Sequence, residues 1–90
     1  MSIEIEFSSI FAKYTGNQTD IKVEGKTVGE CLHDLARRYP DFGKMLFDKN
    51  GELSALFDIF INGESVYPHT MTHPVKDGDK LNIVMLIHGG

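Results

Sequence analysis

The amino-terminal segment alternates apolar and polar residues in the manner of a half-buried β-strand. Its apolar positions are Ile3, Ile5 and Phe7. A second alternation, with Ile21 and Val23 on its apolar side, follows a stretch rich in turn-forming residues at positions 14–19. The two alternations predict a pair of strands that form a hairpin with a loose connecting loop.

Helical periodicity begins after Thr27. Thr27 and Glu30 have the spacing of a capping box, in which the two side chains satisfy backbone N–H groups at a helix start. Apolar residues then recur at intervals of three and four: Val28, Cys31, Leu32, Leu35 and Tyr39. Because Pro40 disfavours helical geometry at the residue before it, the helix should end there. We therefore expect an amphipathic helix of about three turns, with its apolar stripe on the sheet.

The second half of the chain predicts two or three more strands. Residues 41–56 suggest irregular or short structure, whereas residues 57–61 have the composition of a strand. Asn62-Gly63 suits a two-residue hairpin turn, so residues 64–66 should pair back briefly. Residues 81–87 are largely apolar on both alternating faces, which is typical of a strand in the middle of a sheet. This order describes one α+β unit without repeats or linkers.

Composition and charge narrow the classes of function. The chain of 90 residues carries 13 acidic and 9 basic side chains, and its formal net charge is −4. This charge disfavours nucleic acid as a partner and favours a protein with a basic docking face. Acidic residues interrupt the apolar positions at the amino terminus, so we expect no signal peptide, no membrane span and a cytoplasmic location. The single cysteine also favours a reducing compartment.

Other chemistry-bearing residues give weak signals. Cys31 lies on the apolar stripe of the predicted helix, which favours a packed, unreactive thiol. His69 and His73 have a four-residue spacing, but prolines flank them and no second ligand pair follows, so we expect no metal site. Gly25-Lys26-Thr27 lacks the earlier glycine of a phosphate-binding loop. The sequence shows neither a nucleophile with its base nor a pair of carboxylates at a catalytic spacing, so it does not indicate an independent enzyme.

A series of landmarks in fixed order gives the sequence a recognisable family character. They are Phe11-Ala12, Gly16, Thr27-Val28, Tyr39-Pro40, Asn62-Gly63-Glu64, Val75-Lys76-Asp77-Gly78-Asp79 and the final Gly89-Gly90. In these features the chain resembles the MoaD/ThiS family of ubiquitin-like sulfur carriers. The turn at residues 48–53 looks more like the MoaD-like members, the type of the molybdopterin synthase small subunit. Many relatives carry prolines just before the tail, where this chain has Leu86-Ile87-His88.

The resemblance implies a fold and a working group. The fold would be the β-grasp of ubiquitin, a mixed sheet of four to five strands packed against one main helix, over residues 1–90. Residues 88–90 would form a flexible tail, in which His88 and Gly89 enter a partner's active site and Gly90 carries sulfur. Glycines lack a Cβ and can thread a narrow channel. Three residues beyond Ile87 reach at most about 10 Å.

By the same resemblance, partner enzymes supply the chemistry. A ubiquitin-activating-like adenylyltransferase would use ATP and magnesium to adenylate the Gly90 carboxylate, and a persulfide donor would convert it to a thiocarboxylate. An acceptor synthase, such as the large subunit of molybdopterin synthase, would then take the sulfur. The chain itself is expected to bind no cofactor and to act as a carrier or accessory subunit. Val84, Leu86 and Phe60 are candidates for a docking patch, with burial in the core as the alternative.

Several alternatives stay open at this point. The sulfur acceptor is expected to belong to molybdenum or tungsten cofactor synthesis, with thiamine, cysteine or another metabolite as further choices. In a second class, an activated Gly90 would acylate lysines of other proteins, as in a ubiquitin-like modifier. In a third class, the domain would be a binding module whose carboxy terminus has no chemical role.

Overall fold

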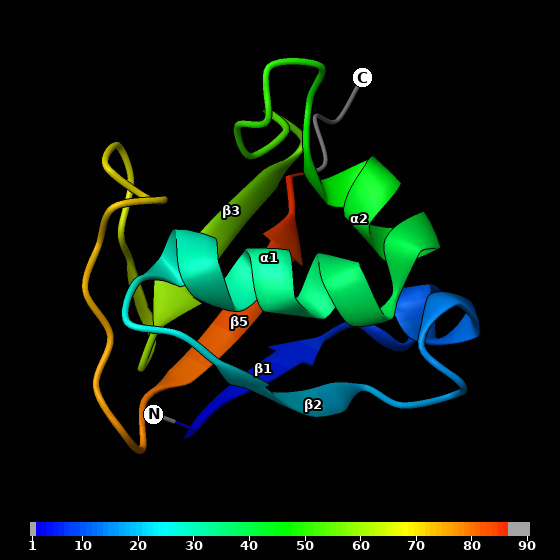
Figure 1. Ribbon diagram of the computed structural model, residues 1–90, viewed down its shortest axis with the longest axis horizontal. Coiled ribbons are helices and arrows are strands. Elements are labelled where there is room, and N and C mark those ends of the chain that lie inside the picture. The colour runs from blue at the N-terminus through cyan, green and yellow to red at the C-terminus, as the bar shows by residue number, and fades with distance from the viewer. Residues whose placement is uncertain (1, 87–90) are drawn as a thin grey trace.

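The computed structural model describes residues 2–86 and shows a twisted sheet with helices on one face (Figure 1). Its elements are β1 (Ser2–Phe7), the 3-10 helix η1 (Ser9–Tyr14), β2 (Asp20–Glu24), α1 (Val28–Arg38), α2 (Pro40–Leu46), β3 (Phe57–Ile61), β4 (Glu64–Ser65) and β5 (Lys80–Met85). No helix among the described residues is long and apolar enough to cross a membrane. The order of strands and helices is the predicted α+β order.

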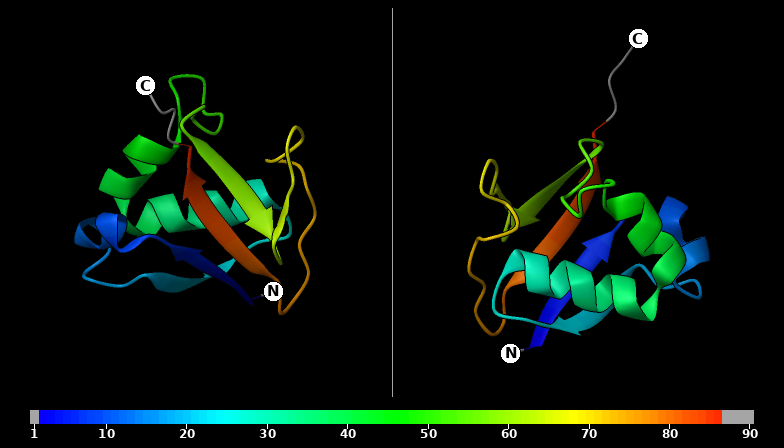
Figure 2. Two further views of the ribbon diagram at one scale, coloured as in Figure 1. Left: turned by 180° about the vertical axis from the view of Figure 1, so that it is seen from behind. Right: turned by 45° about the horizontal axis from the view of Figure 1, so that its top comes forward.

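The sheet has five strands in the order β2-β1-β5-β3-β4. β1 is antiparallel to β2 and parallel to β5, and β3 is antiparallel to both β5 and β4. The last strand therefore lies in the middle of a mixed sheet, as its apolar composition predicts, and the two further views show it between β1 and β3 (Figure 2). Burying the carboxy-terminal strand at the centre fixes the place from which the tail departs.

The core lies between the sheet and α1, with α2 closing one end. The fully buried side chains include Ile3, Ile5, Val23, Val28, Leu32, Leu35, Phe42, Leu46, Ile59 and Leu81. Phe42 of α2 is the centre of an aromatic cluster, with its ring centroid 5.0 Å from that of Phe7 and 5.5 Å from that of Phe11. The short structure expected after residue 40 is thus a helix that seals the core. Pro40 ends α1 and also occupies the first turn of α2, where a missing N–H costs nothing.

The predicted cap of α1 is present with one change of partner. Thr27 Oγ1 accepts a hydrogen bond from the Glu30 N–H at 3.1 Å. The Glu30 carboxylate accepts from the Lys26 N–H at 2.9 Å, one residue before the position expected in a capping box. Both side chains still satisfy backbone donors near the start of the helix, so α1 begins at Val28 as predicted.

A long-range contact joins the start of α1 to the segment between β4 and β5. The N–H groups of Val28 and Gly29 donate to the carbonyl oxygens of His73 and Met71, both at 2.9 Å. A Cβ on Gly29 would lie 2.7 Å from the Met71 oxygen, so only glycine allows this approach. The segment at residues 70–73 is therefore held against the helix.

The β3–β4 hairpin has the predicted Asn62-Gly63 turn. Both residues have positive φ, 49° and 89°, as a two-residue hairpin turn of this dipeptide requires. The Asn62 side chain donates to Asp79 Oδ1 and accepts from the Lys80 N–H, each at 3.1 Å. These bonds tie the hairpin to the start of β5 and fix the register between β3 and β5.

Side chains occupy much of the hydrogen-bonding capacity at the outer edges of the sheet. On β2, the Glu24 N–H donates to Asp34 Oδ2 at 3.0 Å and the Lys22 carbonyl accepts from the Arg38 guanidinium. On β3, the Ile59 N–H donates to Asp58 Oδ1 at 2.8 Å, and the Ile59 carbonyl accepts from Val66. These contacts reduce the number of backbone groups on β2 and on this part of β3 that another strand could pair with.

Candidate functional site

The predicted tail residues His88, Gly89 and Gly90 lie outside the described residues. The structure does show the base from which they continue. β5 ends at Met85, and the Leu86 N–H then donates to the Leu56 carbonyl at 2.7 Å. The chain is therefore held to the sheet up to the position immediately before Ile87. This anchored end of β5 is the structural part of the candidate site.

Of the three candidate docking residues, Val84 and Leu86 lie at this end of the sheet, whereas Phe60 pairs with Asn82, nearer the start of β5. Val84 and Leu86 are 37% and 39% exposed, so the part of the chain that the structure describes does not cover them. Phe60 of β3 is half-buried. The alternation along the strands places them on the face away from α1, because Leu81 and Ile83 on the other face are buried. The sequence analysis left the exposure of these residues open, and their role in docking stays a prediction.

Further exposed apolar residues surround the same end and were not predicted. Ile10 of η1 is 60% exposed and Leu56, just before β3, is 51% exposed. Ile10 and Val84 line one hollow of about 400 Å³ between η1 and β5. We call Ile10, Val84 and Leu86 the tail-base patch. No sequence signal marks Ile10, because a single apolar residue in a loop does not reveal whether the fold buries it.

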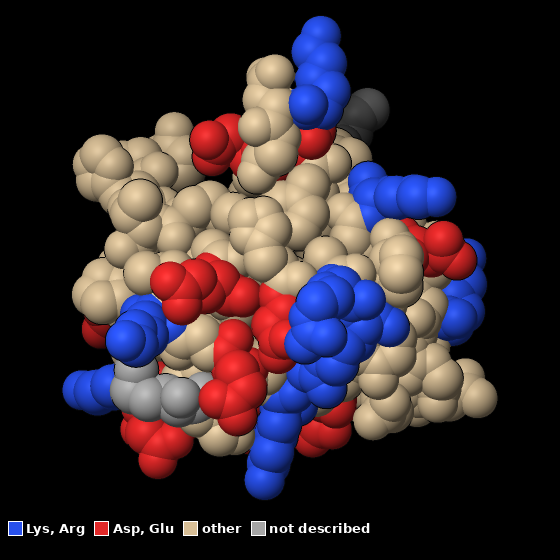
Figure 3. All heavy atoms as spheres, in the orientation of Figure 1, with Lys and Arg blue, Asp and Glu red and all other residues tan. Residues whose placement is uncertain are grey.

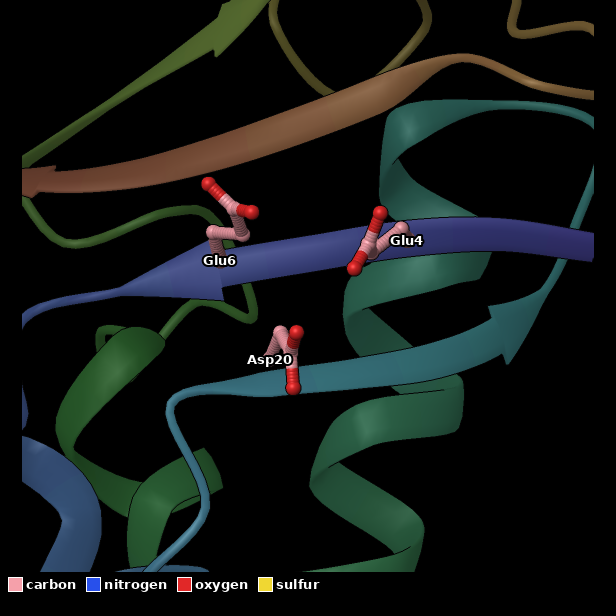
Figure 4. Close-up of side chains that lie close together, drawn as sticks. All are labelled: Glu4, Glu6 and Asp20. Carbon is pink, nitrogen blue, oxygen red and sulfur yellow. The ribbon is translucent and has the colours of Figure 1, made fainter.

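Carboxylates gather further along the same sheet (Figure 4). Glu4 and Glu6 of β1 and Asp20 of β2 have carboxylate oxygens within 4.8 Å of one another. Lys80 Nζ lies 3.1 Å from Glu6, and this contact raises the pKa of Lys80. Since exposed acidic groups commonly gather without an ion, we assign this cluster a contribution to surface charge and no metal site. It gives the sheet an acidic region beside the apolar tail-base patch.

The other titratable candidates stay apart from the end of β5. Cys31 is fully buried, and burial together with the nearby Glu30 and Asp34 carboxylates raises the pKa of its thiol to about 11. A neutral, buried thiol is a poor nucleophile, which agrees with a packing role. His69 and His73 do not belong to any group of three potential metal ligands among residues 2–86. His73 Nδ1 instead lies 2.9 Å from the Pro74 carbonyl oxygen.

Basic side chains on the helix face are mixed with acidic ones (Figure 3). Asp34 forms ion pairs with Arg37 and Arg38. The pKa of Asp34 is lowered, first by the hydrogen bond from the Glu24 N–H and then by the two arginines. The charges of Arg37 and Arg38 are therefore partly neutralised by Asp34.

Comparison with known proteins identifies the family. The sequence pattern of the ThiS family matches residues 6–90. A relative from Archaeoglobus fulgidus, described as a candidate sulfur carrier protein, is 30% identical over 77 residues, which are 82% of this chain and 88% of the relative. A chain of the Amycolatopsis orientalis BexX/CysO complex superposes with a TM-score of 0.86 at 26% identity, covering 98% of this chain and 99% of that chain.

A third similar protein is small archaeal modifier protein 1 (SAMP1) of Haloferax volcanii. One structure of SAMP1 superposes with a TM-score of 0.84 at 25% identity and covers 100% of both chains. These structural matches confirm the β-grasp fold. The family match and the relative together confirm the resemblance seen in the sequence. The chain therefore belongs to the ThiS family and is a ubiquitin-like sulfur carrier of the ThiS/MoaD type.

Proposed function

We propose that the protein carries sulfur as a thiocarboxylate on Gly90. A carboxylate is a poor acylating group, so an adenylyltransferase first transfers AMP from ATP to it. Pyrophosphate bound to magnesium is the leaving group of this step. The terminal sulfur of a persulfide then displaces AMP, and a thiol cleaves the resulting acyl disulfide, which releases the thiocarboxylate and a new disulfide. Gly89 and His88 follow the carboxylate into the partner's active site. Membership of the ThiS family, through a match that extends to Gly90, supports this proposal.

The observation that carries the proposal is the anchored, apolar end of β5. The hydrogen bond between Leu86 and Leu56 holds the base of the tail at 2.7 Å, and the exposed Val84 and Leu86 lie on the same strand end. An enzyme that receives the tail must contact this base. Exposed apolar residues at such a place are typical of a protein docking site.

The tail-base patch and the acidic cluster together suggest the surface of the partner. An apolar area on the partner would cover Ile10, Val84 and Leu86, and basic residues would face Glu4 and Asp20. The BexX/CysO complex shows that a structurally similar chain assembles with a second protein. We therefore propose that the adenylyltransferase, and later the acceptor synthase, dock on this part of the sheet.

For the acceptor, we propose a precursor in molybdenum or tungsten cofactor synthesis, delivered through the large subunit of a molybdopterin synthase. The resemblance of the sequence at residues 48–53 to the MoaD-like members supports this choice. Synthesis of thiamine, cysteine or another metabolite would use the same thiocarboxylate tail. Sulfur delivery to each small acceptor can be measured with one thiocarboxylated preparation and separate acceptor enzymes.

A second function, attachment to other proteins through Gly90, is favoured by the likeness to small archaeal modifier protein 1. Both functions start from the same adenylate. In one, sulfur replaces an oxygen of the carboxylate; in the other, a lysine amine of a target protein displaces AMP and forms an amide bond. The mass of the chain therefore rises by the difference between sulfur and oxygen in the first case and by the mass of the target protein in the second.

Intact mass spectrometry separates these outcomes. The chain is incubated with its adenylyltransferase, ATP, magnesium and a persulfide donor. We expect the mass increase of one sulfur-for-oxygen exchange, located on Gly90 by fragmentation. A variant with two alanines appended after Gly90 is the matched control and should not acquire sulfur. Equal biological activity of that extended variant would instead identify a binding module without tail chemistry.

A further inference from the structure

A second hollow lies on the other side of the tail base, along the outer edge of β3. It has a volume of about 780 Å³. We call it the edge groove, and the lining residues that matter here are Leu53, Phe57, Asp58, Tyr67, Met71 and Leu86. In Figure 1 the segment that follows β4 stands to one side of β3 and forms the outer wall. Leu86 thus belongs both to this groove and to the tail-base patch.

The outer wall is fixed by backbone contacts. Met71 and His73 accept hydrogen bonds from the first N–H groups of α1 at 2.9 Å, and Val75 donates to the Lys26 carbonyl at 3.0 Å. Gly29 permits this close approach, since a Cβ there would lie 2.7 Å from the Met71 oxygen. The groove is therefore formed in the free protein and does not require a ligand to open it.

The lining combines apolar surface with negative charge. Leu53, Phe57, Met71 and Leu86 supply apolar side chains, while Glu52 and Asp58 supply carboxylates. None of the described residues that line the groove is lysine or arginine. The Asp58 carboxylate is held in place, because Oδ1 accepts from the Ile59 N–H at 2.8 Å and Oδ2 accepts from Ser65 Oγ at 2.9 Å. The groove thus presents at least one positioned anion beside a hydrophobic surface.

The backbone at this edge offers little to an incoming strand. The Ile59 N–H is bonded to Asp58 and the Ile59 carbonyl accepts from Val66 at 3.2 Å. The Phe57 N–H donates to the Ser54 carbonyl at 3.1 Å. A ligand of this groove is therefore recognised through its side chains rather than by extending the sheet.

We propose that the edge groove binds an apolar segment of the activating enzyme that carries a lysine or arginine side chain. The inference rests on the proposed function and identifies a second contact for that partner. Charge complementarity selects the cation, and the apolar lining selects the stem that carries it. The position of the groove indicates the partner, because Leu86 lines it and directly precedes residues 87–90 in the sequence. The enzyme that binds the tail would therefore reach the groove. The partner would thus hold the tail base from two sides.

The first test uses a small mimic of such a side chain. Butylguanidinium is titrated into the ¹⁵N-labelled full-length chain, with pentanol and pentanoate as the neutral and anionic analogues. We expect backbone amide shifts confined to residues 52–58, 67–72 and 86, with butylguanidinium the tightest ligand. Shifts confined to the sheet face around Glu4 and Glu6, or equal shifts with pentanoate, would contradict the proposal.

A charge-matched pair of variants makes the result specific. Glu52→Gln with Asp58→Asn removes both groove carboxylates and keeps an oxygen acceptor for the Ile59 N–H. Asp41→Asn with Glu64→Gln changes the charge by the same amount at exposed positions outside the groove. The groove pair should weaken butylguanidinium binding about five-fold, and the control pair should leave it unchanged. Equal weakening of butylguanidinium binding by both pairs would show that only the net charge of the protein matters, which would contradict the proposal.

The second test uses the adenylyltransferase of the same organism and follows adenylation of Gly90. We expect the groove pair to raise the KM for the carrier about five-fold with kcat unchanged, and the control pair to leave both constants unchanged. Normal kinetics of the groove pair would overturn this inference while the proposed function stands. If Gly90 of the unaltered protein is not adenylated, the proposed function is overturned instead. Concentration-dependent shifts in the free protein, or shifts caused by deleting residues 87–90, would assign the groove to a second copy or to the tail.

Discussion

Both faces of β5 carry apolar residues, yet these residues differ in exposure. Leu81 and Ile83 on the inner face are at most 3% exposed, whereas Val84 on the outer face is 37% exposed. The inner residues pack under α1 and define the core. The described part of the chain covers Val84 only in part, which leaves more than a third of its surface accessible. The difference separates side chains that maintain the fold from side chains that remain available to a partner.

The largest effect is expected on the inner face. Leu81→Ala leaves a cavity in a fully buried position, and such truncations typically lower the free energy of unfolding by about 2–5 kcal/mol. Urea unfolding followed by circular dichroism measures the change. Val84→Ala on the outer face is the control and should cost below about 1 kcal/mol. Similar losses for both variants would remove the contrast between the faces.

A somewhat smaller effect is expected where α1 meets the wall of the edge groove. Gly29→Ala places a methyl group 2.7 Å from the Met71 oxygen, so the segment at 70–73 must shift. Overpacking of this kind typically costs about 1–3 kcal/mol. Urea unfolding measures the loss, and hydrogen exchange should show faster exchange at Val28 and at residue 29. Lys44→Ala, at an exposed position of α2, serves as control; an equal loss there would exclude the steric explanation.

On the outer face the expected effect is functional. Val84→Asp introduces a charge into the tail-base patch without disturbing the core. The free energy of unfolding should change by less than about 1 kcal/mol, while adenylation of Gly90 should slow about ten-fold at subsaturating carrier. Initial rates of pyrophosphate release measure this. Asn17→Asp, at an exposed position that lines neither the edge groove nor the hollow between η1 and β5, is the control, and unaltered rates for Val84→Asp would exclude the patch from docking.

The smallest effect concerns the turn that begins β5. The Lys76 N–H at 2.9 Å, and next the Asn62 amide, lower the pKa of Asp79, whose side chain is buried. A lowered pKa means that the carboxylate stabilises the fold above its unfolded pKa of about 4 and loses this contribution as the pH falls through the lower folded value.

Asp79→Asn should therefore reduce stability by about 1–2 kcal/mol at pH 7, and the difference from the unaltered protein should shrink toward pH 2. Urea unfolding at the two pH values tests this. Glu64→Gln, an exposed change of the same charge, should show little difference at either pH. A deficit of Asp79→Asn that persists at pH 2 would assign the effect to hydrogen bonding alone.

Local signals predicted much of the fold. The capping residues and Pro40 set the ends of α1, and the Asn62-Gly63 turn set the hairpin of β3 and β4, because each acts through its immediate neighbours. The wall at residues 70–73 was not predictable, since it depends on hydrogen bonds between positions more than forty residues apart in sequence, such as Gly29 and Met71.

The candidate site was predicted in part. Alternation showed that Val84 and Leu86 share a face of β5, but a strand that is apolar on both faces does not reveal which face is covered. Ile10 and the edge groove arise only when η1, β3 and the segment after β4 come together. The chemistry of Gly90 came from family resemblance and stays a prediction, as the tail lies beyond the described residues.

The side chains that occupy the sheet edges bear on how a carrier can be stored. Asp34 and Arg38 cover backbone groups of β2, and Asp58 covers the Ile59 N–H on β3. Fewer free backbone groups at these places lower the tendency of strands in neighbouring copies to pair with each other. Each copy would remain a separate reagent, available one at a time to whichever enzyme next needs it.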